Sequence, residues 1–179
     1  MMPRWRSPKP GIATADRKWE RLDPDFKQRL LTVFRVMRER NRDFHQAYPD
    51  DHRRLVSLLE AAASGDVRTP DGAVVGPDRV RQLGNLLGMS DGAARLHHLL
   101  ELDHRSPAFR HDLAAALPFG GRNPLYAVVH ESCWADGGAT RWSAERVMPE
   151  DFRDDGTLLT GEHVSPIVFD EDPALRPLR

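Results

Sequence analysis

The near absence of strand patterning is the feature that most constrains the fold of this chain. Apolar residues recur at intervals of three and four along most of the sequence, and only the short pair Val74–Val75 resembles part of a strand. Spacing of this kind gathers apolar side chains on one face of a helix, whereas strands need alternation or a buried β-branched run. The sequence therefore predicts a mainly α fold.

Proline, glycine and serine mark where the predicted helices begin and end. The first follows Asp23, with Pro24 in its first turn, and stops before Pro49; the second covers 51–64 and is closed by Gly65. A turn or small hairpin is expected at 66–75. Later helices are expected to begin at Pro77 (running through Leu87), Ser90 (as the cap), Ser106–Pro107, Asn123–Pro124 and Thr140, before a short, partly helical tail from Thr160.

Length and proline content suggest one domain with an arm. The 179 residues are enough for a single ordinary domain with a real core. Residues 1–22 contain three prolines and a glycine, which disfavour any regular element, so we expect an irregular N-terminal arm there. Residues 23–179 are expected to form the helical domain.

The charge balance and the cysteine count exclude several classes of protein. Lys plus Arg is 26 and Asp plus Glu is 27, so the net charge of −1 offers no basic excess for nucleic acid. Cys133 is the one cysteine, which excludes an intrachain disulfide and a multi-cysteine metal site. No apolar run suggests a signal peptide or a membrane span, so we expect a cytoplasmic location.

Residues 88–92 match G-x-S-x-G, the pattern of a serine nucleophile at a sharp turn. That turn requires a strand before the serine, whereas residues 80–87 are predicted to be helical. We therefore expect Ser90 to cap a helix, and we predict no catalytic residue in this chain.

The same region, 79–102, resembles a helix-turn-helix, and a stand-alone helical binding module is the alternative function. The second helix of this segment would begin with Asp91, Gly92 and two alanines. This start would present a negative charge to DNA phosphates and little to base edges, so we do not predict nucleic acid as a partner.

Three potential metal ligands, His97, Glu101 and His104, follow one another at helical spacings of four and three. Such ligands could bind zinc, which leaves a metal-binding helical protein as a third class. A polar helix face gives the same pattern without any metal, and no fourth ligand is evident. The favoured interpretation has no metal and no cofactor.

Two glutamates, Glu131 and Glu162, are the strongest candidates for substrate binding. Glu131 lies at the end of an apolar predicted helix, and Glu162 follows Thr160–Gly161. Two carboxylates converging on a pocket would bind a substrate ammonium group. Spacing alone favours the alternative of two solvated surface glutamates.

Several ordered blocks resemble the prolyl aminopeptidases (proline iminopeptidases), serine peptidases of the α/β-hydrolase fold. The resemblance covers residues 32–179. Its blocks are Asp66–Gly72, Leu83–Leu100, Asn123–Glu131, Ala139–Val147, Leu158–Glu162 and Asp172–Arg179. In that family this stretch is a helical cap inserted into the hydrolase core. The resemblance implies that Glu131 and Glu162 bind the amino terminus of a peptide with an N-terminal proline. Tyr126, Trp134 and Phe169 would line the proline pocket.

The sequence also departs from the family. No G-x-S-x-G-G string precedes residue 32, the family's catalytic Asp and His would follow the cap, and Ser165 stands where the family tends to have an aromatic residue. We therefore expect a cap without its hydrolase core that is inactive alone, either a truncated gene product or one piece of a split enzyme. A peptide that begins with proline is the expected partner if a hydrolase core complements the cap. Without that core we expect an exposed apolar surface and self-association. The residues expected to form this surface are Leu83, Leu86, Leu99, Leu100 and Val128.

Overall fold

The computed structural model describes residues 24–119, 124–132, 142–161, 165–173 and 175–178. Within these ranges the regular elements are helices, and the β structure is one isolated antiparallel bridge between Arg68 and Val74. The predicted mainly α fold class is therefore confirmed. The helices are α2 (Pro24–Ala47), α3 (Asp51–Ala63), α4 (Pro77–Arg81), the 3₁₀ helix η2 (Gln82–Gly88), α5 (Gly92–Glu101), α6 (Pro107–Ala116), α7 (Leu125–Ser132), α8 (Ser143–Val147), α9 (Glu150–Asp154), α10 (Pro166–Glu171) and the 3₁₀ helix η3 (Arg176–Leu178).

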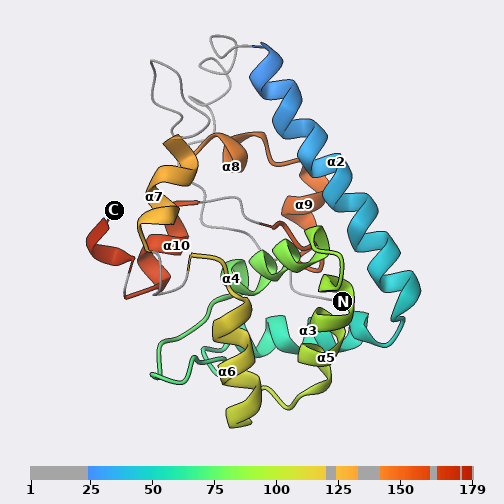
Figure 1. Ribbon diagram of the computed structural model, residues 1–179, viewed down its shortest axis with the longest axis vertical. Helices are drawn as coiled ribbons and strands as arrows, with labels where there is room; N and C mark the ends of the chain where they lie inside the picture. Colours follow the sequence, from blue (N-terminus) through green and yellow to red (C-terminus); the bar gives the residue numbers. More distant parts are fainter. Residues whose placement is uncertain (1–23, 120–123, 133–141, 162–164, 174, 179) are drawn as a thin grey trace.

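Figure 1 shows α2 as a long rod along one side of the molecule, with α7 and α10 on the other side. Helices α3, α5 and α6 lie together at one end. The central elements α4 and η2 join these parts, since η2 contacts α2 and α5 while α4 contacts α3 and α10. The chain from 76 to 88 thus connects the three regions of the fold.

Helix boundaries follow the turn and capping residues in most places. Pro24 and Pro77 each begin a helix, as predicted. Ser106 is the N-cap of α6, where its hydroxyl oxygen accepts a hydrogen bond from the backbone N–H of Phe109 (3.1 Å). Residues 66–75 form the expected small turn, in which the N–H of Thr69 donates to the carbonyl oxygen of Ala73 (3.0 Å).

The largest apolar cluster lies among α3, η2, α5 and α6. Its central side chains are leucines with 0% exposure, namely Leu55, Leu83, Leu96 and Leu113. Burying one leucine side chain stabilises a fold by about 1.5–3 kcal/mol, so this cluster is the main source of stability at this end of the molecule.

The expectation that Leu83, Leu86, Leu99 and Leu100 would be exposed is wrong. All four belong to the main cluster, and none is more than 6% exposed. They are covered because α2 packs on η2, while α3 and α6 pack on α5. Val128 on α7 is 39% exposed, as expected.

The helix predicted from Pro77 through Leu87 is present, but it changes type, because α4 ends at Arg81 and η2 follows directly as a 3₁₀ helix. The backbone N–H of Met89 donates to the carbonyl oxygen of Leu86 (2.8 Å), three residues back. A Cβ atom at Gly92 would overlap that same carbonyl oxygen, so only glycine fits there. Residues 79–102 therefore lack the first α-helix of a helix-turn-helix.

No helix in the described ranges combines the length and the apolar character needed to cross a lipid bilayer. The longest, α2, carries arginine and glutamate side chains along much of its length.

Candidate functional site

Helix α7 carries the segment in which Glu131 lies. The residue occupies the last turn of α7, and its side chain lies outside the part of the structure that is described. The neighbouring face of α7 is open, since Leu125 is 61% exposed and Tyr126, Val128 and Val129 are also exposed. The helix therefore presents an apolar strip to solvent on the same element as the predicted ammonium ligand.

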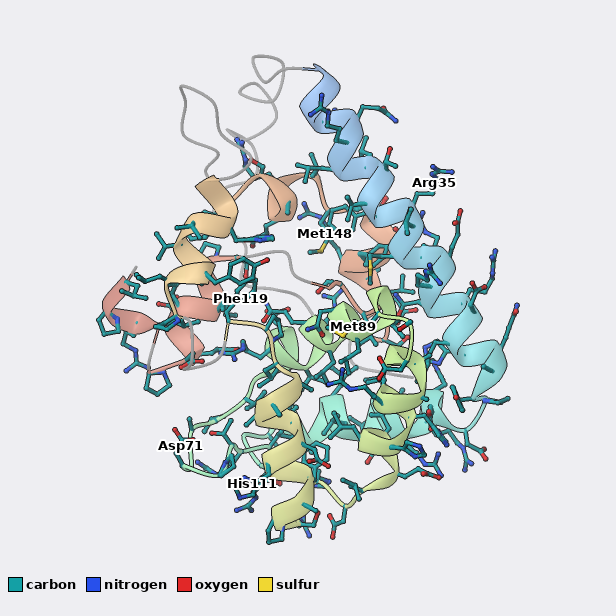
Figure 2. All side chains as sticks on the ribbon, viewed as in Figure 1. Arg35, Asp71, Met89, His111, Phe119 and Met148 are labelled. Carbon is teal, nitrogen blue, oxygen red and sulfur yellow. The ribbon has the colours of Figure 1, made fainter. Side chains whose placement is uncertain are left out.

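The inner face of α7 packs into a small apolar cluster with α10. Ala127, Phe119 and Phe169 are buried in it together with Val168 and Leu175. The rings of Phe119 and Tyr126 lie 5.4 Å apart, and Figure 2 shows Phe119 beside α7. Phe169 is 2% exposed and contacts the ring of Trp142 at 5.5 Å. Phe119 thus joins the two predicted pocket residues, with Tyr126 towards solvent and Phe169 inside the cluster.

The backbone leading to Glu162 is held from α2. Asn41 has no exposed surface, and its Nδ2 donates to the carbonyl oxygen of Leu159 (2.9 Å). Its Oδ1 accepts from the backbone N–H of Leu159 (2.9 Å). A single buried amide therefore pairs with both backbone groups of Leu159, which fixes the chain three residues before Glu162.

A second set of contacts holds the same segment from α4. The guanidinium of Arg81 donates to the carbonyl oxygens of Leu158 (3.1 Å) and Phe152. The backbone carbonyl oxygen of Arg81 accepts a hydrogen bond from the N–H of Thr160 (2.9 Å). Gly84 approaches closely as well, since a Cβ there would lie 2.8 Å from the backbone nitrogen of Gly161. Residues 158–161 are thus held against α2, α4 and η2.

The structure describes only some of the predicted site residues. Glu162 and Trp134 lie outside the described residues. Tyr126 and Phe169 share one cluster, and α7 carries Glu131 on its last turn. The buried anchors Asn41 and Arg81 were missed by sequence reasoning, because polar residues on an amphipathic helix resemble its solvated face. The spacing of apolar residues gave no indication that Asn41 and Arg81 are buried.

Ser90 lies in an exposed turn between η2 and α5. The element before it is a 3₁₀ helix, so the strand required by a nucleophile turn is not there. The prediction that Ser90 caps α5 is wrong, because Asp91 occupies the N-cap position.

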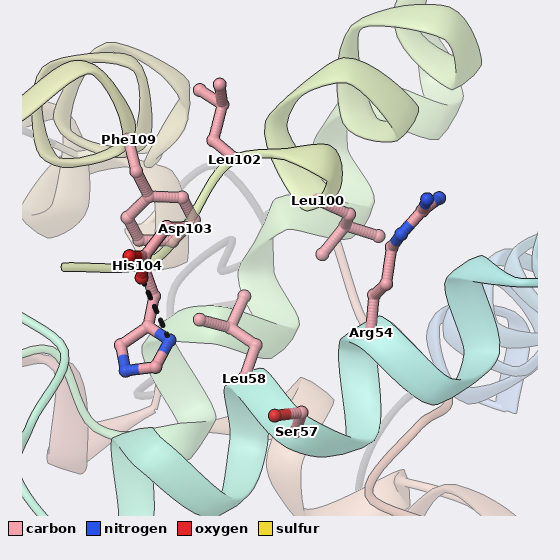
Figure 3. Close-up of a pocket in the computed structure, with 8 residues that line it drawn as sticks. All are labelled: Arg54, Ser57, Leu58, Leu100, Leu102, Asp103, His104 and Phe109. Atoms are coloured by element: carbon pink, nitrogen blue, oxygen red, sulfur yellow. Dashed lines mark ion pairs between the residues drawn. The ribbon is translucent and has the colours of Figure 1, made fainter. Parts of the chain in front are cut away.

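A small cavity of about 160 Å³ lies among α3, α5 and α6, away from α7 and α10. Figure 3 shows its lining, which is Arg54, Ser57, Leu58, Leu100, Leu102, Asp103, His104 and Phe109. Ordinary ligand pockets measure about 300–1,000 Å³, so this cavity is too small for a peptide end. His104 lines this cavity and lies beyond the end of α5 at Glu101. The prediction that His97, Glu101 and His104 share one helix face is therefore wrong.

Partly buried carboxyl groups lie where α10 meets α4. Burial raises the pKa of Glu171 to about 7, with a further contribution from the nearby Asp78 carboxylate. Burial also raises the pKa of Asp78, while the neighbouring Arg81 opposes that shift. Arg79 pairs with Asp172 at 2.7 Å. Glu171 therefore makes the α4–α10 junction sensitive to pH near neutrality.

Comparison with known proteins identifies the class to which this chain is similar. No protein-family model matches it. Curated relatives do match, and they are peptidases that the chain resembles along most of its own length. The predicted resemblance to one segment of a longer enzyme is therefore confirmed.

The relatives are proline iminopeptidases. The enzyme of that name from Aeromonas sobria is 30% identical over 161 residues, which cover 82% of this chain and 36% of the relative. Proline iminopeptidase aneH from Aspergillus aculeatus is 24% identical over 164 residues, covering 85% of this chain and 36% of the relative. The chain thus spans about a third of the length of the curated relatives it matches.

Proposed function

We propose that this chain is the substrate-binding cap of a prolyl aminopeptidase-like hydrolase and holds the amino terminus of peptides that begin with proline. The observation that carries the proposal is the 30% identity to the Aeromonas sobria proline iminopeptidase across 82% of the chain. The helical fold, in which the core of the chain forms without any sheet in the described residues, is compatible with a cap.

Glu131 and Glu162 supply the charge in this proposal. The ammonium of an N-terminal proline has two N–H donors, so it can be held by two carboxylates at once. At 4 Å and an effective dielectric constant of 20, each contact is worth about 4 kcal/mol before desolvation. The hydrogen bonds that hold Leu159 support the role of Glu162, because a fixed backbone reduces the entropy lost when the ligand is bound.

The aromatic residues supply the apolar part of the pocket. Tyr126 lies against Phe119 and remains 36% exposed to solvent, which suits a ring that covers the proline. Trp134 would complete the lining. Phe169 would contribute indirectly, because its buried ring packs in the apolar cluster that contacts α7.

We further propose that this segment does not cleave peptides on its own and that the catalytic serine, aspartate and histidine belong to a hydrolase core outside it. The position of Ser90 supports this proposal, because a serine after a 3₁₀ helix lacks the strained strand-to-helix turn of a hydrolase nucleophile. The family reaction would be the release of N-terminal proline by acyl transfer to serine.

Calorimetric titration with prolinamide tests the binding proposal. We expect saturable binding that N-acetylprolinamide, which lacks the ammonium, does not show. Glu131→Gln and Glu162→Gln should each weaken binding at least about tenfold, which is a loss of about 1.4 kcal/mol. Glu150→Gln, an exposed control on α9, should bind as the wild type does. Equal affinity for the acetylated ligand, or no effect of either glutamate variant, would contradict the proposal.

Hydrolysis of a chromogenic proline amide tests the second part separately. We expect no turnover by the wild type or by Ser90→Ala. Turnover that disappears in Ser90→Ala would show that Ser90 is a nucleophile, and it would overturn the inactivity of the isolated chain without affecting the binding result.

A further inference from the structure

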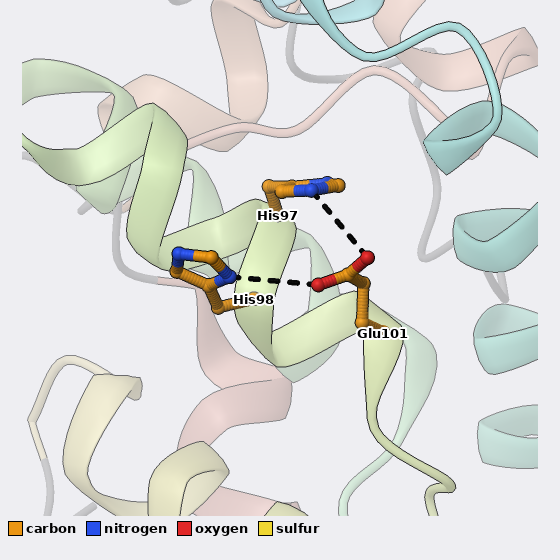
Figure 4. Close-up of side chains that lie close together, drawn as sticks. All are labelled: His97, His98 and Glu101. Carbon is orange, nitrogen blue, oxygen red and sulfur yellow. Dashed lines mark hydrogen bonds and ion pairs between the residues drawn. The ribbon is translucent and has the colours of Figure 1, made fainter.

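Three potential metal-ligating side chains lie close together on α5, a helix that does not carry the proposed substrate ligands. His97, His98 and Glu101 place one nitrogen or oxygen atom each within 4.8 Å of one another. His97 Nε2 lies 3.6 Å from Glu101 Oε1, and His98 Nδ1 lies 3.5 Å from Glu101 Oε2. Figure 4 shows both rings directed at the same carboxylate.

The ring of His97 is held in one orientation by α3. Asp51, which is 0% exposed, lies with Oδ2 at 2.9 Å from His97 Nδ1, where the carboxylate accepts a hydrogen bond from a protonated Nδ1. Tyr48 stacks on the ring at a centroid distance of 4.1 Å. In the neutral imidazole, a proton on Nδ1 leaves the lone pair on Nε2, which is the atom that faces Glu101. A buried carboxylate behind a histidine is the arrangement that orients metal-binding imidazoles.

We propose that His97, His98 and Glu101 form a zinc-binding site. Ligands about 2.0–2.1 Å from a tetrahedral Zn²⁺ ion lie roughly 3.4 Å from each other, close to the two separations seen here. Two imidazoles and one carboxylate are a ligand set that zinc accepts, and they leave a fourth position for water. The His97 side chain would change little on binding, because Asp51 and Tyr48 already fix it.

The charges around the site are compatible with a cation. Arg54 is a positive group near the site, with Nη2 at 3.9 Å from Glu101 Oε1. Arg54 makes a shorter contact with Asp51 Oδ1 at 2.6 Å, and this contact can remain when a metal ion binds Glu101. His98 and Glu101 are open to solvent, so the ion can enter without rearrangement of the core.

Zinc titration of the full chain, without an affinity tag and after chelator treatment, tests the site in competition with a chromogenic chelator. We expect one Zn²⁺ per chain. His98→Ala and Glu101→Gln should each weaken binding at least about tenfold. His111→Ala removes an exposed histidine on α6 (Figure 2) and should change the affinity less than about twofold. His98 is 74% exposed, so its replacement leaves the fold intact.

The proposal is overturned if the chain binds no zinc saturably, or if His98→Ala binds as tightly as the wild type. It is also overturned if His111→Ala weakens binding as much as His98→Ala does, because zinc would then be held by scattered surface histidines. A tetrahedral absorption spectrum with Co²⁺ that His98→Ala abolishes would support the proposed ligand set.

Discussion

Replacing Glu171 with glutamine should remove a pH-dependent weakness at the junction of α4 and α10. The Glu171 carboxyl lies against Gly76, where a Cβ atom would overlap Oε1, and its Oε2 is buried without a hydrogen-bond partner. Burial, aided by the charge of Asp78, raises the pKa of this carboxyl to about 7 from the ordinary value of 4.5. The folded chain therefore prefers Glu171 protonated, whereas the unfolded chain ionises it above about pH 4.5.

The sign of the effect follows from proton linkage. Between pH 4.5 and 7 the folded state binds more protons at Glu171 than the unfolded state, so this group lowers the free energy of unfolding as pH rises. A full shift of this size corresponds to about 3 kcal/mol. Because Glu171 is partly exposed, solvent screening reduces the expected effect to about 1–2 kcal/mol. Glutamine has nearly the same shape and cannot ionise.

Urea denaturation of the wild type and Glu171→Gln at pH 5 and pH 8, followed by circular dichroism, measures the difference. We expect similar stability at pH 5 and a glutamine variant that is about 1–2 kcal/mol more stable at pH 8. Glu150→Gln, an exposed change on α9, should show no such pH-dependent gain. A Glu171→Gln variant that is equally stable or less stable than the wild type at pH 8 would refute the reasoning.

Three further changes test the fold. Gly92→Ala should cost at least about 2 kcal/mol in thermal or urea unfolding because its Cβ has no room against the backbone of η2, whereas Gly88→Ala, which faces open space, should cost less than about 1 kcal/mol. Asn41→Ala should cost about 2–4 kcal/mol in urea unfolding, since it leaves the buried N–H and carbonyl groups of Leu159 unpaired. Val129→Lys should shift sedimentation towards monomer if the exposed strip of α7 drives self-association; an unchanged oligomer distribution would contradict that role.

Much of the helical framework could be predicted because its boundaries depend on local chemistry. Pro24, Pro77 and the Ser106 cap act within one turn of the helix that they begin, so their effect can be recognised from the sequence. The short α9 was not predicted, since five residues are too few to show a helical period. The change from α4 to η2 was missed for another reason, because apolar residues three and four apart fit either kind of helix.

The wrong prediction about exposed leucines has a physical cause that also limits inference from a resemblance. A leucine that faces a separate hydrolase core and a leucine that faces a neighbouring helix of the same chain give the same helical periodicity. In this chain the second case applies to Leu83 and Leu99, because α2 packs on η2 and α3 on α5. Periodicity identified the buried face but could not identify what buries it.

Sequence patterns were also insufficient for the polar residues near the candidate site, because they did not show that Asn41 and Arg81 are buried. Asn41 and Arg81 contact backbone atoms more than 70 residues away in sequence, at Leu159 and Leu158. Their partners are backbone groups, which every residue carries. The sequence at 158–161 therefore contains no pattern that would predict these hydrogen bonds. If the cap proposal is correct, Asn41 is a positioning residue for Glu162. Its replacement should then weaken prolinamide binding through the backbone of Leu159, although Asn41 would not touch the ligand.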